Sequence, residues 1–480
     1  MGFDAKVPAT LSAPSPDILS RLEAIVGPSH VVSTPSGMEE FLDEPRGRFH
    51  GSALCAVQPG SSQEVGAILS LCNELNIPVV PQGGNTGLVG GQVPVGEGRE
   101  IVLSLRRLKA LREIDPCSNT MTVEAGMILA EAKEEAARAG RVFPLTLGAE
   151  GSCTIGGNLA TNAGGTNVIA YGNARDLVLG LEVVLPDGRI LSDLSKLRKN
   201  NTGFDLTHLF VGSEGTLGVI TAAVLKLFPK PRAVETAFIG LASPRAALDL
   251  LDLARDMAGG EITSFELLPR IGLDFVLAHF DSREVLRGKH SWYVLLELSS
   301  QRAEGLLERM LALLEEATAK RIIEDAAVAS SLDQRANFWK LRELLPEAQS
   351  REGGSIKHDV SVPIASIPVF LAEAERAVVS AIPGTRLVAF GHVGDGNIHC
   401  NVSQPMGADP KAFLARWDEV NAIVHGLVIA HKGSISAEHG IGQLKRDLLA
   451  RVKDKTAMEV MRAIKKTLDP KGILNPGKVL

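Results

Sequence analysis

Residues 151–165 read Gly-Ser-Cys-Thr-Ile-Gly-Gly-Asn-Leu-Ala-Thr-Asn-Ala-Gly-Gly, a run of small residues without a charged side chain. Such a run indicates that something large approaches the backbone closely. Two further glycine clusters lie at 81–91 and 212–218. Successive glycines let backbone N–H groups converge on phosphate oxygens. Any one of these clusters alone can be an ordinary surface loop, but the three together predict a large ligand that contains a polyphosphate.

The bulk composition excludes several classes of protein. The 480 residues carry 50 basic and 56 acidic side chains, for a net charge of −6, and aromatic residues make up only 4%. Nucleic-acid binding is usually marked by a basic footprint or an aromatic stacking platform, so we expect no nucleic-acid partner. No apolar run reaches the ~18 residues needed to cross a bilayer, so we expect no membrane span.

Cysteine usage and the first residues bear on the compartment. The five cysteines are odd in number, lie far apart and form no C-x-x-C pair, which favours a reducing compartment over a disulfide framework. Residues 1–15 contain no apolar core segment and include Asp4, so they match neither a secretory signal nor a transit peptide. We therefore predict a cytoplasmic protein.

The character of the sequence changes at Phe228-Pro229-Lys230-Pro231. Short strands and glycine loops precede this point, and glycine becomes sparse after it. Long helices are predicted beyond it, at 244–257, 303–317, 331–350, 364–382 and 410–431. Ser243-Pro244 and Asp409-Pro410 each match an N-cap followed by a proline in the first helical position. We predict four parts: an N-terminal segment (1–45), a ligand-binding domain (46–230), a second domain (231–436) and a C-terminal segment (437–480).

Two nucleotide-binding motifs are tested and rejected. The dinucleotide fingerprint G-x-G-x-x-G is absent from the chain. Residues 472–478 match G-x-x-x-x-G-K, but Val479 follows where a P-loop has Ser or Thr, and no helix follows to receive a phosphate.

Residues 391–401 read Gly-His-Val-Gly-Asp-Gly-Asn-Ile-His-Cys-Asn. Asp-Gly between apolar runs is a strong signal for a two-residue hairpin turn. With Asp395-Gly396 as that turn, His392 lies opposite His399, and Phe390 lies opposite Asn401 on the same face. Side chains directly opposite each other are ~4.5–5.5 Å apart at Cβ. Two imidazoles and an amide so placed suit a divalent transition metal, and a structural histidine pair is the alternative.

A second cluster of polar residues, Ser436-Ala437-Glu438-His439-Gly440-Ile441-Gly442, strengthens the metal interpretation. Glu438 could complete a two-histidine, one-carboxylate site that leaves positions open for a substrate. His439 is then the adjacent general base. An exposed loop pair is the alternative for these two residues.

The glycine clusters, written P-x-G-G-N-T-G, G-S-C-x-I-G-G-N-x-A-T-N-A-G-G and G-S-E-G-T-L-G-V-I-T, resemble the FAD-binding domain of the vanillyl-alcohol oxidase/p-cresol methylhydroxylase superfamily. The resemblance implies an α+β fold, with a two-subdomain FAD-binding domain of the p-cresol methylhydroxylase type and an α+β substrate (cap) domain with an antiparallel sheet. No histidine lies in the three loops, so we expect non-covalent FAD. The implied FAD contacts are Pro81, Gly83, Gly84, Asn85, Thr86, Gly87, Gly148, Ser152, Gly156, Gly157, Asn158, Thr161, Asn162, Gly164, Glu214, Gly215, Gly218, Ile220 and Asn475.

The patterns G-H-x-G-D-G-N-x-H-x-N and A-E-H-G-I-G extend the likeness to about residues 45–480, which resemble the D-2-hydroxyglutarate/D-lactate dehydrogenase branch of that superfamily. The resemblance implies that a divalent metal, with zinc expected, binds His392, His399 and Glu438. It implies catalytic roles for His439 and Asn401, and a substrate carboxylate held by Arg342 and Lys357. Considered alone, either cation could be a solvated surface charge. One departure concerns Pro346, which stands where D-2-hydroxyglutarate enzymes can carry a hydroxyl residue one helical turn after this arginine.

From the residues and the resemblance we predict an FAD-dependent dehydrogenase. It would oxidise a small D-2-hydroxy acid, with a D-2-hydroxyglutarate-like acid favoured, and pass electrons to an electron-transferring flavoprotein or a quinone. A homodimer is one expectation for its assembly. Two alternatives stay open: a D-lactate or glycolate dehydrogenase or oxidase of the same family, and a catalytically inert flavin-binding subunit.

Overall fold

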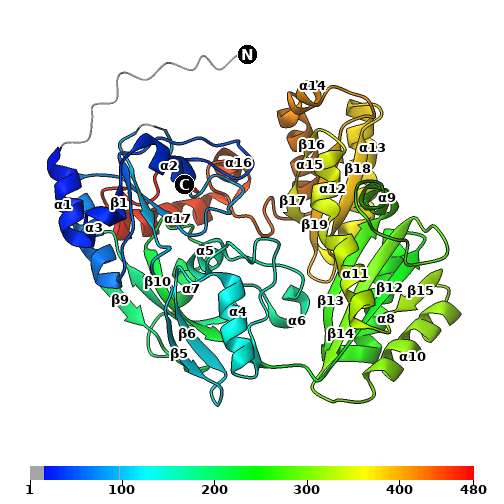
Figure 1. Cartoon of the computed structure of the whole chain (residues 1–480). Coiled ribbons are helices and arrows are strands. Elements are labelled where there is room, and N and C mark those ends of the chain that lie inside the picture. Colours follow the sequence, from blue (N-terminus) through cyan, green and yellow to red (C-terminus); the bar gives the residue numbers. More distant parts are fainter. Residues whose placement is uncertain (1–15, 97) are drawn as a thin grey trace.

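The computed structural model describes residues 16–96 and 98–480, and they form two lobes (Figure 1). The first lobe runs from α1 (Pro16–Val26) to β11 (Phe228–Pro229) and also contains the C-terminal helices α16 (Arg446–Val452) and α17 (Lys455–Leu468). The second lobe runs from β12 (Ala233–Leu241) to α15 (Trp417–Ala430). Separate hydrophobic cores underlie them, one built from residues between 18 and 228 together with 473–474, and others from residues between 237 and 428. Residues 1–15, in which we predict no targeting signal, lie outside the described residues.

The first lobe contains two main sheets. A four-stranded sheet has the order β1-β2-β4-β3, in which β2, β4 and β3 are parallel. A five-stranded antiparallel sheet has the order β5-β6-β10-β8-β9, in which β8 and β9 form a hairpin. The strands are β1 (Val31–Val32), β2 (Cys55–Val57), β3 (Val79–Gln82), β4 (Ile101–Ser104), β5 (Leu111–Asp115), β6 (Thr120–Glu124), β8 (Val178–Val184), β9 (Ile190–Asp193) and β10 (Val219–Lys226), with the separate pair β7 (Arg141–Val142) and β11 (Phe228–Pro229).

Helices cover these sheets and connect them to the glycine loops. The first glycine loop follows β3, the second surrounds α5, and the third leads into β10. Ser61 is the N-cap of α3, because its Oγ accepts the N–H of Glu64 at 3.1 Å. The helices of this part are α1 (Pro16–Val26), α2 (Pro35–Leu42), α3 (Ser62–Leu75), α4 (Leu129–Arg138), α5 (Ile155–Thr161), α6 (Val168–Tyr171) and α7 (Thr207–Phe210).

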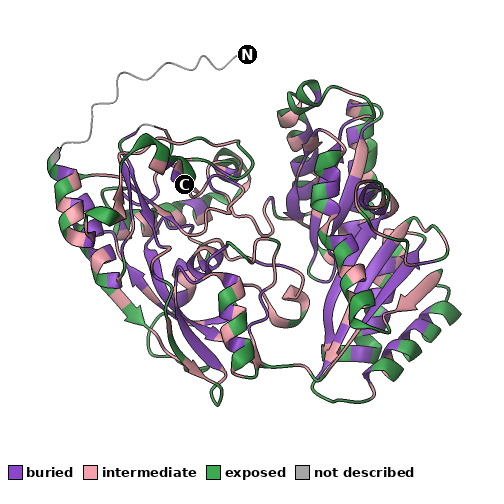
Figure 2. Ribbon diagram, in the orientation of Figure 1, coloured by how far each residue is buried: buried purple, intermediate pink, exposed green. Residues whose placement is uncertain are grey.

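The second lobe is built on an eight-stranded antiparallel sheet with the path β15-β12-β14-β13-β18-β19-β16, where β17 also pairs with β19. All eight residues of β13 are buried, and Figure 2 shows the central strands as the purple interior of this lobe, whereas β15 is of intermediate burial. Strands β12 and β13 were not predicted from the sequence. The strands are β12 (Ala233–Leu241), β13 (Ile262–Pro269), β14 (Trp292–Ser300), β15 (Asp325–Val328), β16 (Ser355–Ile356), β17 (Asp359–Ser361), β18 (Arg386–His392) and β19 (Asn397–Ser403).

Two predicted long helices of this lobe are each divided in the structure. The predicted helix 331–350 is α11 and α12, which separate at Leu344, because Pro346 lacks an N–H for the helical ladder. The predicted helix 410–431 is α14 and α15. Both predicted proline starts, at Ser243 and Asp409, are N-caps in the structure. The helices are α8 (Pro244–Ala258), α9 (Arg270–His279), α10 (Leu306–Ala319), α11 (Leu332–Glu343), α12 (Leu345–Arg351), α13 (Ile367–Ala381), α14 (Pro410–Leu414) and α15 (Trp417–Ala430).

After α15 the chain returns to the first lobe, where α16 (Arg446–Val452) and α17 (Lys455–Leu468) lie beside its N-terminal elements (Figure 1). Its last residues join the edge of the four-stranded sheet, since Val79 N donates to Ile473 O and Asn475 N donates to Val79 O, each at 2.8 Å. This return carries residues 436–442 across the space between the lobes. No helix among the described residues is long and apolar enough to cross a membrane.

Candidate active site

A cavity of about 1120 Å³ lies between the lobes. The glycine loops of the first lobe line one part of it, and polar side chains from β18, β19 and the segment after α15 line another. Its volume exceeds the ~300–1,000 Å³ of ordinary small-molecule sites, so it can hold a dinucleotide together with a small substrate.

The first two glycine loops are pressed against each other. A Cβ on Gly83 would lie 2.3 Å from Thr154 Oγ1, and one on Gly84 would lie 1.9 Å from the Ser152 carbonyl oxygen. Real Cβ atoms do not approach so closely, so these positions require glycine. The Asn85 side chain holds the same loop by donating to Glu40 O and Asp43 O at 3.0 and 2.9 Å.

The third loop fixes the segment that crosses between the lobes. The Glu214 carboxylate accepts the N–H groups of Ile441 and Gly442 at 2.7 and 2.8 Å. Burial raises the pKa of Glu214. The Asn475 side chain donates to the carbonyl oxygens of Gly91 and Glu214 at 2.9 and 2.7 Å. The third loop therefore positions the residues beside it, as well as lining the cavity.

The structure brings most of the predicted FAD-contacting residues to the cavity. Two of the predicted residues do not line it. Asn162 ends α5 with φ +53°, and its Oδ1 accepts the N–H of Arg175 at 2.9 Å. Asn475 is buried behind the third loop. Those that line it are Pro81, Gly83, Gly84, Asn85, Thr86, Gly87, Gly148, Ser152, Gly156, Gly157, Asn158, Thr161, Gly164, Glu214, Gly215, Gly218 and Ile220.

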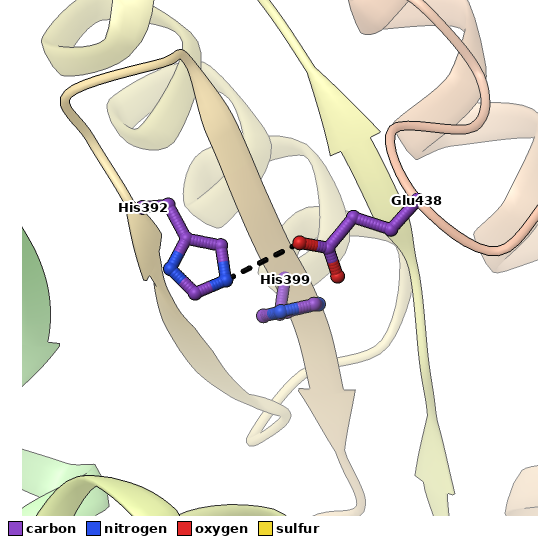
Figure 3. Close-up of side chains that lie close together, drawn as sticks. All are labelled: His392, His399 and Glu438. Atoms are coloured by element: carbon purple, nitrogen blue, oxygen red, sulfur yellow. Dashed lines mark ion pairs between the residues drawn. The ribbon is translucent and has the colours of Figure 1, made fainter. Parts of the chain in front are cut away.

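His392, His399 and Glu438 converge at the second-lobe side of the cavity (Figure 3). One potential ligand atom from each lies within 4.8 Å of the others, and His392 Nε2 is 3.3 Å from Glu438 Oε1. Burial lowers the pKa of His399 to about 4, which keeps its imidazole neutral and able to donate a lone pair. Two imidazole nitrogens and one carboxylate form a donor set that fits a divalent transition metal.

The hairpin that carries both histidines differs from the predicted register. Phe390 pairs with His399, and Val388 pairs with Asn401, so the predicted pairs His392–His399 and Phe390–Asn401 are wrong. The turn spans residues 393–396, because Val393 is fully buried in the second-lobe core. The slip amounts to two positions, and side chains alternate with period two, so both histidines keep the same face. Their ring centroids are 5.9 Å apart.

Glu266, from the centre of β13, is a site residue that sequence analysis missed. It is fully buried, and it accepts hydrogen bonds from His392 Nδ1 at 2.5 Å and Arg342 Nε at 2.8 Å. Burial alone would raise the pKa of Glu266, but the charges of His392 and Arg342 lower it to about 2. A buried acidic residue in an apolar strand is destabilising unless it is paired. The position of Glu266 among apolar residues was therefore the sequence signal that could have indicated a buried, paired carboxylate.

The contact with Glu266 determines how His392 can act. Because Nδ1 is bonded to Glu266, Nε2 is the nitrogen that faces Glu438. Burial alone would lower the pKa of His392, yet Glu266 and Glu438 raise it to about 10. The two carboxylates thus favour a positive charge at Nε2, whether a proton or a metal ion supplies it.

Asp359, on β17, organises the loop that carries Glu438 and His439. Its Oδ2 accepts both of their backbone N–H groups, at 3.0 and 2.9 Å, and lies 3.5 Å from His439 Nδ1. Its Oδ1 accepts Asn397 Nδ2 at 2.9 Å. Burial alone would raise the pKa of Asp359, but His439 and Lys445 lower it. Although Asp359, Glu438 and His439 also form a group that could hold an ion, these hydrogen bonds give Asp359 a positioning role.

The remaining predicted site residues all line the cavity. Arg342, at the end of α11, places its guanidinium carbon 4.8 Å from the centre of the Phe390 ring. Lys357 donates to Pro346 O at 3.3 Å and Ser350 Oγ at 3.2 Å. Asn401 bonds to His358 N and Gln349 Oε1. Its amide is therefore occupied in fixing neighbouring backbone and side chains.

Family models match both parts of the chain. One described as "FAD binding domain" matches residues 53–193, and one described as "FAD linked oxidases, C-terminal domain" matches residues 230–479. The chain belongs to the FAD-linked oxidase family. The cavity therefore serves an FAD-dependent oxidoreductase, and its glycine cradle and volume fit that cofactor.

Similar proteins confirm the resemblance predicted from the motifs. This FAD-linked oxidase is 38% identical to the mitochondrial D-2-hydroxyglutarate dehydrogenase of Danio rerio, with 94% of this chain and 83% of that protein covered. It is 37% identical to a D-2-hydroxyglutarate dehydrogenase of Xanthomonas citri pv. viticola, with 97% of each covered. It is 36% identical to a putative mitochondrial D-lactate dehydrogenase of Schizosaccharomyces pombe, with 92% and 85% covered.

Solved structures confirm the predicted fold class. Alkyldihydroxyacetonephosphate synthase matches this FAD-linked oxidase with a TM-score of 0.78 at 18% identity, over 98% of this chain and 86% of that chain. Substrate-bound p-cresol methylhydroxylase matches with a TM-score of 0.75 at 17% identity, over 96% of each.

Proposed function

We propose that this enzyme oxidises a D-2-hydroxy acid to the 2-oxo acid, with D-2-hydroxyglutarate or a similar acid favoured. The proposal rests on the observation that one cavity is lined by four features. They are a glycine cradle for FAD, an arginine that could bind a carboxylate, a candidate metal cluster and a histidine that could act as a base. The relatives named above, among them two D-2-hydroxyglutarate dehydrogenases, support the substrate class.

The substrate carboxylate is assigned to Arg342 and Lys357. Glu266 occupies Nε of Arg342, and among residues 16–96 and 98–480 no hydrogen bond engages its two Nη groups. A guanidinium held on one edge offers its remaining N–H groups to a carboxylate. Lys357 supplies a second positive charge, and its bonds to Pro346 O and Ser350 Oγ direct the ammonium.

His439 is assigned as the base that takes the hydroxyl proton. Its Nδ1 lies 3.5 Å from the Asp359 carboxylate, which leaves Nε2 for the proton. Asp359 stabilises the imidazolium that forms, and its bonds to the backbone N–H groups of Glu438 and His439 hold the loop in place. A divalent ion, for which we propose zinc, would bind His392, His399 and Glu438 and would polarise the substrate hydroxyl. FAD, when bound, accepts the hydride from the substrate Cα.

Three other features of the proposal follow from the residues and the comparisons. Among the described residues, the first-lobe lining of the cavity contains no histidine, which supports non-covalent FAD. An electron-transferring flavoprotein or a quinone is proposed as the acceptor. All five cysteines are unpaired, in keeping with a reducing compartment. Because the Danio rerio and Schizosaccharomyces pombe relatives are named mitochondrial, a cytoplasmic location stays a prediction.

A D-lactate dehydrogenase is the second candidate function. Pro346 lines the cavity next to Lys357 and offers neither a hydroxyl nor a backbone N–H to a second carboxylate. The Schizosaccharomyces pombe relative also carries a D-lactate dehydrogenase name.

The test of the proposed function is a substrate panel. The anaerobic holoenzyme, supplied with zinc, is mixed with D- and L-2-hydroxy acids while the absorbance of the flavin band is followed. Bleaching by D-2-hydroxyglutarate or D-malate, and not by their L-isomers, is the expected result. Bleaching only by D-lactate or glycolate would reassign the substrate. No bleaching by any acid would refute the reaction.

A pH dependence follows from the environment of Lys357. Burial, with the charges of Arg46 and Arg48, lowers the pKa of Lys357 to about 8. The ammonium of Lys357 is charged below this pH and neutral above it. Its binding of the substrate carboxylate therefore weakens as the pH rises. We expect kcat/KM, measured from about pH 6 to about pH 10, to decline above about pH 8. Lys357→Arg should move the decline upward, because guanidinium stays charged. The same decline in both enzymes would contradict this assignment.

A further inference from the structure

Two arginines from the N-terminal part of the chain, Arg46 and Arg48, line the same cavity as Lys357. They lie on the loop between α2 and β2, far from the predicted substrate-binding cations in the sequence. Neither arginine was predicted from the sequence to be a site residue.

Their loop is held rigidly by a buried acid. Glu44 is 2% exposed, and its Oε2 accepts the N–H groups of Arg46 and Arg48 at 3.0 and 3.2 Å. The Gly47 N–H donates to Glu44 O at 2.8 Å, and Glu44 N donates to Phe49 O at 3.1 Å. The turn thus presents two arginines, two positions apart, from a fixed backbone, which lowers the entropy cost of binding a ligand.

The N–H donors of the two guanidinium groups are available to a ligand. Within residues 16–96 and 98–480, neither side chain forms an ion pair or a hydrogen bond, whereas Arg342 is bonded to Glu266. Arg48 stacks its guanidinium carbon 3.8 Å from the ring centre of Trp417, on α15 of the other lobe. Stacking uses the face of the guanidinium and leaves its N–H edge free for a planar anion.

The two arginines act electrostatically on Lys357, one of the two cations assigned to the substrate. Their charges act on Lys357 strongly enough to help lower its pKa, and Asp359 acts on Arg46. The carboxylate of Glu44 also acts on both arginines, but among the described residues neither guanidinium forms an ion pair with an acid. Three cations that line one cavity favour an anionic ligand group. Pro346, next to Lys357, has no donor to offer such a group.

We propose that Arg46 and Arg48 form a subsite, together with Lys357, that binds the distal carboxylate of a dicarboxylic D-2-hydroxy acid. The proposal rests on the proposed function, because it assumes that Arg342 holds the carboxylate next to the reacting carbon. It makes the N-terminal loop a determinant of substrate specificity. The competing occupant of the two arginines is an FAD phosphate.

The experiment compares two substrates of equal chain length, D-2-hydroxyglutarate and D-2-hydroxyvalerate, which lacks the distal carboxylate. Arg46→Gln, Arg48→Gln and the double variant are purified as holoenzymes, and their FAD content is measured from the absorbance spectrum. We expect kcat/KM for D-2-hydroxyglutarate to fall ~10- to 100-fold in each single variant, the loss of a hydrogen bond to a charged group. The fall for D-2-hydroxyvalerate should stay under about threefold. Arg48→Lys should restore part of the loss, because it returns the charge without the planar donors.

Arg245→Gln is the matched control, since Arg245 is an exposed arginine on α8 and does not line the cavity. A second readout is the difference spectrum of oxidised flavin on adding 2-oxoglutarate or 2-oxovalerate, which needs no turnover. Weakened binding of 2-oxoglutarate alone supports the subsite. Equal losses on both substrates overturn it, and so does loss of FAD, which would assign the arginines to the cofactor phosphate.

The outcomes also separate this inference from the proposed function. If the native enzyme oxidises D-2-hydroxyvalerate and D-lactate but not D-2-hydroxyglutarate, the subsite is refuted while the proposed reaction stands. If the native enzyme oxidises none of these acids, the reaction itself is refuted, and the subsite falls with it.

Discussion

His439→Asn is expected to lower kcat by ~10²–10⁴-fold, with FAD still bound. The substitution removes the only group assigned to take the hydroxyl proton. It leaves the backbone N–H of residue 439, which donates to Asp359 at 2.9 Å, in place. The glycine cradle is untouched. The loss should therefore appear in the chemical step, as slow flavin bleaching in an anaerobic single turnover.

The control for this variant is His431→Asn. His431 lies at the end of α15, bonds to Glu373 at 2.8 Å and does not line the cavity. It should bleach at the native rate. Near-native bleaching by His439→Asn would remove His439 from the base role, and loss of FAD from that variant would give the residue a structural role.

Removal of a divalent metal is expected to have an effect of similar size. After treatment with a chelator, the enzyme should lose ~10²-fold or more of its activity, because nothing else in the cluster polarises the substrate hydroxyl. Zinc, cobalt or manganese should restore the activity, since each suits two imidazoles and a carboxylate. Metal content is measured by elemental analysis, and the flavin spectrum reports whether FAD is retained. Full activity at negligible metal content would refute the metal site.

Glu266→Gln separates the metal site from a simple histidine pair. The amide keeps the shape of Glu266 but removes the charge that holds His392 Nδ1 and Arg342 Nε. We expect metal affinity to fall ~10- to 100-fold, as for other residues that support a metal-ligating histidine. Metal titration followed by calorimetry measures this without turnover. Glu297→Gln, in the adjacent strand β14, is a matched control, because Glu297 pairs with Thr236 and Trp339 instead. An unchanged metal affinity in Glu266→Gln would show that Glu266 does not support the metal-binding histidine.

Local sequence determined much of this protein. The glycine clusters predicted loops that bind FAD, and the close approach of two of these loops leaves no room for a Cβ at Gly83 or Gly84. Helix starts at Ser243 and Asp409 were predictable, since capping depends on residues within one turn. The candidate metal ligands His392 and His399 were predicted to share one face, which period-two alternation preserves even when the register changes.

Only the tertiary structure decided the rest. The hairpin register depended on Val393, whose burial in the second-lobe core lengthens the turn. Glu266 reaches His392 because β13 pairs with β18, strands separated by more than a hundred residues. Arg46 joins Lys357 only where the two lobes meet around one cavity. Patterns of neighbouring residues encode turns, caps and faces, whereas contacts between distant strands and lobes are set by the packing of the whole chain.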